Sequence, residues 1–321
     1  MPSILFIYPA LSLQSLAITH ILGYNFINLW LKINSEVIFM LKIATLADWF
    51  GVGLIEGIRE SHRCGAEGVQ IYAADEFDPR SVSKDTIAEV IKTAKEEKQT
   101  VTALCGELGG YGFEIAEDNK DKISYIKKAL ELADKLDCRI VTTHIGVVPS
   151  DPSVPRYQVM LDAMAECGEY AKKMGSYLAV ETGPEAIATL RGLLEMCGGG
   201  VGINYDPANL VMVGADDEVQ GVRTGGEFIV HTHAKDGRSL QKIVPEEFYH
   251  NFAKGGLEWS RSCLCCEETP LGEGNVRWVP YLHALQEVGY DGYLTIEREV
   301  TNGAEDIRMA VGFLQDVLKK L

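Results

Sequence analysis

Charged side chains are absent from residues 1–31, and no lysine or arginine precedes the apolar residues of this stretch. A secretory signal peptide needs a basic start and a small-residue cleavage site, and this stretch offers neither. His20, Asn25 and Asn28 interrupt a clean apolar span of about 20 residues, so a membrane anchor is the weaker alternative. Met40 directly precedes the first convincing strand pattern. We therefore predict that residues 1–39 are an apolar extension outside the fold and that residues 40–321 form a single domain.

Basic residues are scarce relative to acidic ones: 30 lysines and arginines face 46 aspartates and glutamates, for a net charge of −16. A nucleic-acid backbone is held by neutralising basic side chains, so this balance argues against a nucleic-acid partner. With 46% hydrophobic and 24% charged residues, the 321-residue chain has the balance of a soluble globular protein. We expect a cytoplasmic metabolic protein that acts on a small molecule and has no membrane partner. A homo-oligomer stays open.

A second close pair of cysteines is also missing. Cys263, Cys265 and Cys266 cluster, but a structural zinc site needs further ligands at a recognisable spacing. We therefore interpret the cluster as incidental thiols in a loop. The other five cysteines stand singly among apolar residues, which is typical of reduced thiols in a cytosolic protein: Cys64, Cys105, Cys138, Cys167 and Cys197.

From residue 41 onward, short apolar segments alternate with amphipathic ones, the βαβα pattern of a parallel α/β fold. Eight strands are expected, which is the number that closes a (β/α)8 TIM barrel. They cover Lys42–Ala47, Gly68–Ala73, Val101–Cys105, Arg139–Ile145, Tyr177–Glu181, Val201–Asp206, Ile229–His233 and Tyr293–Glu297.

Helices between these strands follow the 3.6-residue period. One apolar stripe runs from Ile123 to Leu136, and another runs from Ile307 to the C-terminus. Only the segment between the seventh and eighth strands is oversized, with a long stretch of little periodicity at about 237–270. Long loops after barrel strands lie at the mouth where substrates bind, so this segment is a candidate lid. A surface excursion is the equal alternative.

Four successive strands each end in a good metal ligand. Side chains alternate between the two faces of a strand. Outward Leu178 and Val180 place Glu181 inside the barrel, and the same parity applies to the sixth and eighth strands. A single acid at a strand end is more often a helix cap or an ion-pair partner, but four with consistent parity favour a shared site. The predicted metal ligands are Glu181, Asp206, His233 and Glu297.

Three carboxylates and one imidazole make an oxygen-rich site that suits Mn²⁺, with Mg²⁺ or Co²⁺ as alternatives, better than Zn²⁺. Such an ion polarises a carbonyl and stabilises an enediolate, while a nearby carboxylate moves the proton. Return of the proton to the other face gives epimerisation, and return to the neighbouring carbon gives isomerisation. His231 fits the same parity one layer deeper, so we expect it to pack behind the ligands rather than bind the ion.

Five motifs of the chain resemble those of the xylose-isomerase-like barrels, the sugar phosphate isomerase/epimerase superfamily, over about residues 41–321. The motifs are VETGPE at 180–185, NYDPAN at 204–209, HTHAKD at 231–236, LGEG at 271–274 and LTIERE at 294–299. The resemblance implies that Glu181, Asp206, His233 and Glu297 hold the metal and that Glu181 and Glu297 are the catalytic acid and base. It also implies a small sugar or sugar-like substrate and a role in carbohydrate metabolism.

Substrate contacts are expected close to these ligands. Ketose 3-epimerases of the superfamily carry a histidine where this chain has Asn209, an arginine six rather than five residues after the histidine ligand, and a second glutamate six rather than four residues after the first. Aromatic side chains of the mouth, Trp49, Phe50, Tyr72, Tyr111 and Phe113, can form a wall against a sugar or simply pack at the rim. The predicted substrate-binding residues are His144, Glu185, Asn209, Trp49 and Arg238.

Three other functions compete with the isomerase or epimerase hypothesis. The same site suits a lyase or dehydratase acting on a keto-sugar or inosose, and a barrel can also bind sugar without catalysis. Endonuclease IV, a trinuclear zinc nuclease, belongs to the same superfamily. Asn209 replaces one of its ligands, and the Asp-x-His expected before Leu271 is absent. These differences and the acidic composition argue against a nuclease.

Overall fold

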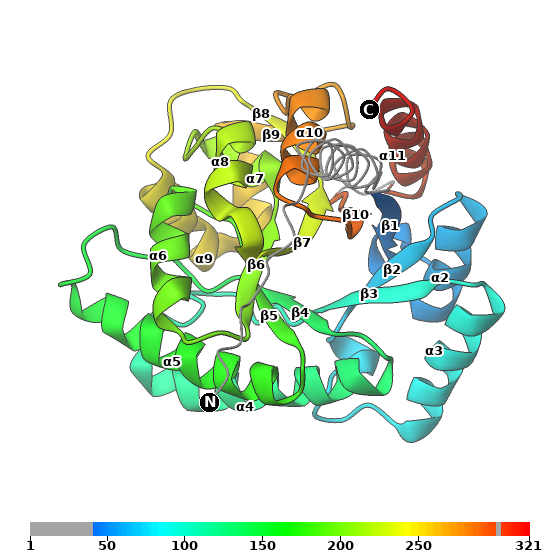
Figure 1. Cartoon of the computed structure of the whole chain (residues 1–321), viewed down its shortest axis with the longest axis horizontal. Helices are drawn as coiled ribbons and strands as arrows, with labels where there is room; N and C mark the ends of the chain where they lie inside the picture. Colours follow the sequence, from blue (N-terminus) through cyan, green and yellow to red (C-terminus); the bar gives the residue numbers. More distant parts are fainter. Residues whose placement is uncertain (1–40, 300–302) are drawn as a thin grey trace, which may run out of the picture. The chain divides into compact units, whose positions relative to one another are not determined.

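A computed structural model describes residues 41–299 and 303–321, and the predicted extension at 1–39 lies outside them. Eight parallel strands close into a barrel in the order β1-β10-β7-β6-β5-β4-β3-β2 (Figure 1). This architecture confirms the predicted (β/α)8 TIM barrel. The barrel strands are β1 (Lys42–Leu46), β2 (Gly68–Tyr72), β3 (Thr100–Cys105), β4 (Ile140–Thr143), β5 (Tyr177–Glu181), β6 (Val201–Tyr205), β7 (Ile229–Ala234) and β10 (Tyr293–Ile296).

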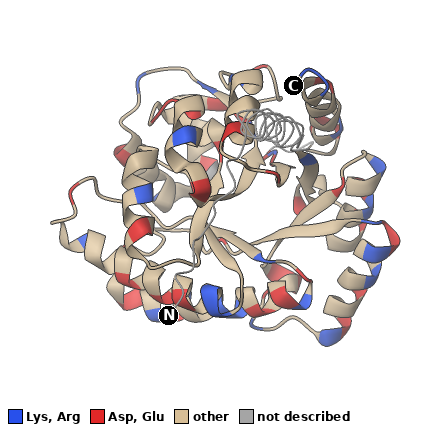
Figure 2. Cartoon of the chain, viewed as in Figure 1, with Lys and Arg blue, Asp and Glu red and all other residues tan. Residues whose placement is uncertain are grey.

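Helices surround the strands and bury their apolar faces against them. Ile123, Ile126 and Leu130 of the predicted stripe are buried in α4, and Ile307 and Val311 are buried in α11. Charged side chains lie mainly on the outer helices, whereas β5 and β6 carry almost none (Figure 2). The α-helices are α2 (Leu54–Arg63), α3 (Lys84–Glu96), α4 (Ala116–Lys135), α5 (Pro155–Lys173), α6 (Ile187–Met196), α7 (Pro207–Val213), α8 (Glu218–Gly225), α9 (Pro245–Ser262), α10 (Trp278–Glu287) and α11 (Gly303–Leu318), and the 3-10 turns are η1 (Ala47–Phe50), η2 (Asp75–Phe77) and η3 (Gly226–Phe228). No described helix is both long and apolar enough to cross a membrane.

The inside of the barrel is lined by small and polar side chains. Hydrogen bonds cross it from strand to strand: Gln70 Nε2 donates to Thr142 Oγ1 at 2.9 Å, and His231 contacts Asn204 at 2.8 Å and Thr295 at 3.1 Å. All five of these side chains are buried. The strand pairing shifts register at two places, just before Gln70 and just before Asn204. Such irregularities can re-aim side chains, and here they lie at Gln70 and Asn204, which both contact His233.

The long segment between β7 and β10 is ordered, unlike the irregular loop that its sequence suggests. It contains an antiparallel hairpin of β8 (Asp236–Ser239) and β9 (Cys266–Thr269), with α9 between the two strands. The helical period of α9 is hidden in the sequence because Gly256 is non-helical, with φ 59° and ψ −156°, and kinks the helix.

Asp236 organises the base of this segment. Its carboxylate accepts hydrogen bonds from the backbone N–H groups of Gly237, Gly272, Gly274 and Val276 and from Trp278 Nε1, at 2.8 to 3.3 Å. Asp236 therefore bonds to the ends of this segment, and no hydrogen bond or ion pair joins it to His233 in the described part of the chain. One buried carboxylate thus fixes both ends of the segment near the barrel.

We predict that Asp236→Ala lowers the free energy of unfolding by about 3 kcal/mol or more, because several buried N–H groups lose their acceptor. Urea denaturation followed by circular dichroism measures this change. Asp134→Ala is the control, since Asp134 makes an exposed ion pair with Arg139 and should change the free energy by less than about 0.5 kcal/mol. Equal unfolding midpoints for both variants would contradict the role of Asp236.

Candidate metal centre

Four side chains from four neighbouring strands meet at the C-terminal end of the barrel. They are Glu181 at the end of β5, Asp206 just after β6, His233 on β7 and Glu297 just after β10. Each offers one ligand atom, and these atoms all lie within 4.8 Å of one another. The residues are between 0% and 6% exposed. The structure therefore brings together the four residues that the strand parity singled out.

The imidazole of His233 is held so that one nitrogen faces the three carboxylates. Its Nε2 lies 3.1 Å from Gln70 Oε1, and Gln70 is itself fixed by its bond to Thr142. Nδ1 lies 3.3 Å from Glu297 Oε2 and 3.6 Å from Glu181 Oε2. Burial alone would lower the pKa of His233, but the Glu297 and Glu181 carboxylates outweigh burial and raise it well above its usual value. The centre therefore favours a positive charge at Nδ1, either a proton or a cation.

The two carboxylate oxygens of Asp206 have different surroundings, since one caps a helix and the other faces the cluster. It is the N-cap of α7, and its Oδ1 accepts from the N–H groups of Ala208 and Asn209 at 2.8 and 3.3 Å. Its Oδ2 lies 3.8 Å from His233 Nδ1. The helix terminus thus orients the carboxylate while one oxygen stays directed at the cluster.

The two glutamates are oriented by hydrogen bonds from neighbours. Glu181 accepts from Asn209 Nδ2 at 3.0 Å and from Asn204 Nδ2 at 3.1 Å. Glu297 Oε2 accepts from Lys235 Nζ at 3.0 Å. Burial would raise the pKa of Glu297, but Lys235 and His233 lower it overall. Both carboxylates are therefore held ionised in a site that water hardly reaches.

Two atoms of the cluster lack a hydrogen-bond partner in the described part of the chain, His233 Nδ1 and Asp206 Oδ2. Both are fully buried, and an unpaired buried polar atom is costly unless something else binds it. The two atoms lie 3.8 Å apart in a cluster of three carboxylates and one imidazole. This donor set fits a hard divalent cation, which would satisfy both atoms and offset the mutual repulsion of the carboxylates.

Lys235 is a residue of the centre to which the sequence gave no role. Its Nζ lies 3.0 Å from Glu297, 3.1 Å from Glu299 and 4.0 Å from Glu268, and only 5% of the residue is exposed. The alternation of side chains along β7 could have identified Lys235, because it is two residues after His233 and so points to the same side of the chain. Parity also applies to Asn204, two residues before Asp206.

His144 adjoins the cluster on the β4 side. Its Nδ1 lies 2.8 Å from Glu107 Oε2, and its Nε2 lies 3.5 Å from Glu181 Oε1. Burial would lower the pKa of His144, but the two carboxylates raise it to about 10. Glu107 was not predicted from the sequence, since it stands in the irregular segment after β3. The pair supplies a cation and a hydrogen-bond donor at the edge of the site.

Glu185 is a buried carboxyl group at the mouth, and its Oε2 has no hydrogen-bond partner in the described part of the chain. Burial raises its pKa to about 8. At neutral pH it is therefore a carboxylic acid, which can donate a proton as well as accept a hydrogen bond.

The raised pKa of Glu185 predicts a pH-dependent stability. Between its usual pKa of 4.5 and about 8, the folded chain keeps a proton that the unfolded chain releases, so stability falls as the pH rises through this window. Glu185→Gln mimics the protonated group and removes this loss. Its melting temperature should exceed that of the wild type by about 3 °C or more near pH 9, and by less near pH 5. Glu218→Gln, at another buried glutamate that is paired with Arg277, is the control. A margin that does not depend on pH would contradict this assignment.

The other predicted substrate contacts are Trp49, Asn209 and Arg238. Trp49, in η1, has a buried indole N–H that no described residue accepts. The side-chain amide of Asn209 donates a hydrogen bond to Glu181, as described above. Arg238 is not brought to the cluster: it stands half-exposed on the hairpin and pairs with Glu267 on β9. Phe50 and Phe113 are buried in the hydrophobic core, so at these two positions the rim-packing interpretation holds.

Comparison with known proteins identifies a family whose sequence pattern this chain matches. The sequence pattern described as xylose isomerase-like TIM barrel matches residues 58–317. An uncharacterized protein of Methanocaldococcus jannaschii is 25% identical over 189 residues, which is 55% of this chain, and the chain spans about half of that protein (56%).

Solved structures resemble the whole barrel. A xylose isomerase domain protein from Planctomyces limnophilus is 23% identical, with a TM-score of 0.70, over 87% of this chain and 96% of that one. A D-psicose 3-epimerase solved with D-fructose is 16% identical, with a TM-score of 0.64, over 87% and 99%. A xylose isomerase-like barrel from Mycobacterium smegmatis in complex with magnesium is 14% identical, with a TM-score of 0.65, over 88% and 97%. At these identities the likeness shows the fold.

Proposed function

The chain belongs to the xylose isomerase-like TIM barrel family, and on this premise we propose that it is a divalent-metal-dependent isomerase or epimerase of a small sugar or sugar-like keto/hydroxy compound. The metal would be held by Glu181, Asp206, His233 and Glu297, and Mn²⁺ is the first candidate before Mg²⁺ or Co²⁺. Epimerases among the structural neighbours support the reaction class, and the magnesium complex supports a divalent ion.

One observation carries this proposal: two buried ligand atoms of a three-carboxylate cluster, His233 Nδ1 and Asp206 Oδ2, have no hydrogen-bond partner among the described residues. Burial of a polar atom without a hydrogen bond is unfavourable, so both atoms favour a further bound group. A divalent cation held by the four residues would satisfy them.

The protein's own groups can move a proton across this centre. A divalent ion, when bound, polarises a carbonyl and stabilises negative charge on neighbouring oxygens. Glu181 and Glu297 reach the cluster from β5 and β10, with β6 and β7 between them in the barrel. One carboxylate can remove the proton beside the carbonyl, and the other can return a proton from a different direction. Lys235 and His144 stabilise their ionised forms.

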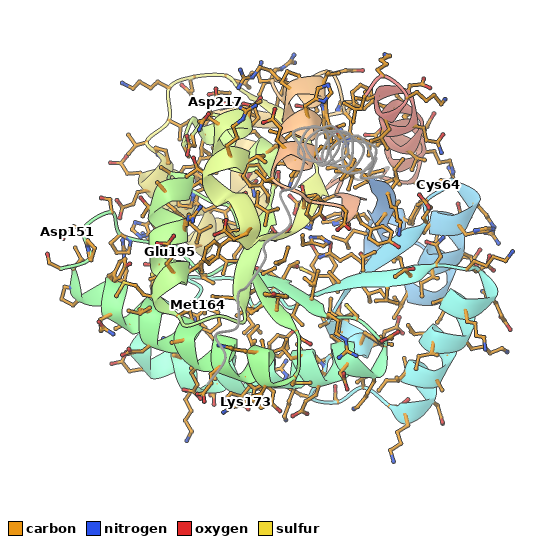
Figure 3. All side chains as sticks on the ribbon, viewed as in Figure 1. Cys64, Asp151, Met164, Lys173, Glu195 and Asp217 are labelled. Carbon is orange, nitrogen blue, oxygen red and sulfur yellow. The ribbon has the colours of Figure 1, made fainter. Side chains whose placement is uncertain are left out.

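The metal site predicts one divalent ion per chain. Mass spectrometry after chelation and refilling should find Mn²⁺, Mg²⁺ or Co²⁺ at one equivalent in the wild type and almost none in Asp206→Ala. Asp217→Ala is the matched control, because Asp217 also caps a helix, α8, but lies outside the cluster (Figure 3). Retained metal in Asp206→Ala would remove Asp206 from the site, and loss in both variants would point to misfolding.

The catalytic assignment predicts that Glu181→Gln and Glu297→Gln each lower the rate of substrate proton exchange by a factor of about 1,000 or more. The measurement is deuterium incorporation into a panel of keto sugars in deuterated water, followed by NMR. Glu218→Gln, a buried glutamate outside the cluster, should keep the wild-type rate. Wild-type exchange in either catalytic variant would remove that residue from the mechanism.

A lyase or dehydratase is the second candidate, because Glu185 offers a protonated carboxyl group that can donate to a leaving hydroxyl. In that reaction Glu181 or Glu297 takes the proton of the C–H bond, the electron pair of that bond forms the C=C bond, and the C–O bond breaks as the hydroxyl takes the proton of Glu185 and leaves as water. Ultraviolet absorbance of the new enone separates the two candidates. Absorbance that grows with turnover favours the lyase, and deuterium exchange without it favours the isomerase or epimerase.

A further inference from the structure

The four ligand residues are almost completely covered, although they lie at the end of the barrel where substrates bind. None of them is more than 6% exposed, and Lys235 and Glu185 beside them are 5% and 9% exposed. Groups buried to this degree offer little surface to a sugar-sized molecule, and His144 beside Glu181 is the more open side, with 37% of its side chain exposed. A cover that moves would open more of this surface to substrate.

Tyr249 of α9 is part of this cover. Its Cε1 lies 3.6 Å from the point that a Cβ on Gly183 would occupy, and Glu185 Oε2 lies 3.7 Å from the same point. Tyr249 and Glu185 therefore both approach Gly183, which is two residues after Glu181. Burial, together with the charges of Glu181 and Asp206, raises the pKa of Tyr249 well above its usual value.

The hydroxyl of Tyr249 makes no hydrogen bond to any residue that the structure describes, and its recorded ring contacts are with Phe248 and Phe252 of the same helix. A tyrosine that is half-buried at a site usually pairs its hydroxyl. Within the described part of the chain, two polar groups near Gly183 thus have no hydrogen-bond partner, the Tyr249 hydroxyl and Glu185 Oε2. Both suit the hydroxyl groups of a polyhydroxylated ligand.

α9 is attached to the barrel differently from the other helices. None of its described side chains is fully buried, whereas α4 and α5 each bury eight residues. Helices with little buried apolar surface open more easily than the rest of a fold. The non-helical Gly256 separates the part of α9 that carries Tyr249 from the part that leads into β9. α9 can therefore move without unfolding the barrel.

Polar contacts hold the first turns of α9 across the mouth. Arg156, at the start of α5, contacts Glu246 at 3.0 Å and His250 at 3.3 Å on α9. The same guanidinium lies 3.1 Å from Glu114, in the segment before α4. The ring of Tyr111 packs 6.2 Å from that of His250. Arg156 therefore joins α9 to two elements that belong to the rigid part of the barrel.

We propose that α9 is a lid over the metal centre, that Arg156 holds it closed, and that Tyr249 on this lid contacts the substrate. Arg156 is a positioning residue, because it acts through α9. The identity of the ligand, a small polyhydroxylated compound, rests on the proposed function, whereas the movement of α9 does not.

Amide hydrogen exchange tests the lid in the full-length protein. Arg156→Ala should increase exchange of residues 245–255 about fivefold, the effect of losing the partly exposed ion pair with Glu246 and the contact with His250. It should also speed loss of Mn²⁺ to EDTA by a similar factor with no change in the amount bound. Arg191→Ala is the matched control, since Arg191 also bridges two acids, Glu195 and Glu227, but away from the mouth. Equal exchange of residues 245–255 in both variants would overturn the role of Arg156.

The contact by Tyr249 is tested with xylitol and D-fructose as probes. Either probe should slow exchange of residues 245–255 in the wild type, and about fivefold more probe should be needed in Tyr249→Phe, which loses only the hydroxyl. Tyr170→Phe, which also loses only a hydroxyl but at an exposed contact with Glu131, should behave as the wild type. No protection by either probe, or equal protection in Tyr249→Phe, would overturn the contact. A protein that binds no divalent ion would contradict the proposed function, while exchange in the metal-free protein still decides whether α9 moves.

Discussion

Mutual repulsion of three buried carboxylates is the constraint around which this barrel is built. Glu181, Asp206 and Glu297 meet within a few ångströms of one another, in a place from which water is nearly excluded. In a medium of low dielectric constant such charges separate or take up protons unless positive charge is supplied. The chain supplies part of it through Lys235 and His144, and it leaves His233 Nδ1 and Asp206 Oδ2 open for the rest.

The division of the strands into two faces follows from this requirement. Outward side chains such as Val180 and Ile203 join the apolar layer beneath the helices, where burial of apolar surface stabilises the barrel. The inward layer below the cluster carries the polar residues Gln70, Asn204 and His231, so it buries less apolar surface. These side chains hydrogen-bond to the ligands or to each other. This layer fixes the ligand side chains before any ion binds.

The sequence predicts the parts of the fold and site that depend on periodicity. The alternation of short apolar segments with amphipathic ones predicts all eight barrel strands with small differences at their ends, and the period of two within a strand selects the four side chains that meet. Tyr249 and Glu107 could not be found in this way, because contacts between separate loops have no sequence period. The predicted substrate contact of Arg238 failed for the same reason, since Arg238 lies on the hairpin of β8 and β9 and its side chain pairs with Glu267. The function of each ligand and the place of residues 1–39 stay predictions.

The insertion between β7 and β10 has a consequence for how such a protein can diversify. It begins and ends at one point of the barrel, where the carboxylate of Asp236 gathers the backbone of residues 237 and 272–276. Within that boundary its length and side chains can change while the ligand-bearing strands keep their register. Selection for a new substrate can therefore act on α9 as a separable module, and the chemistry of the ion need not be rebuilt each time.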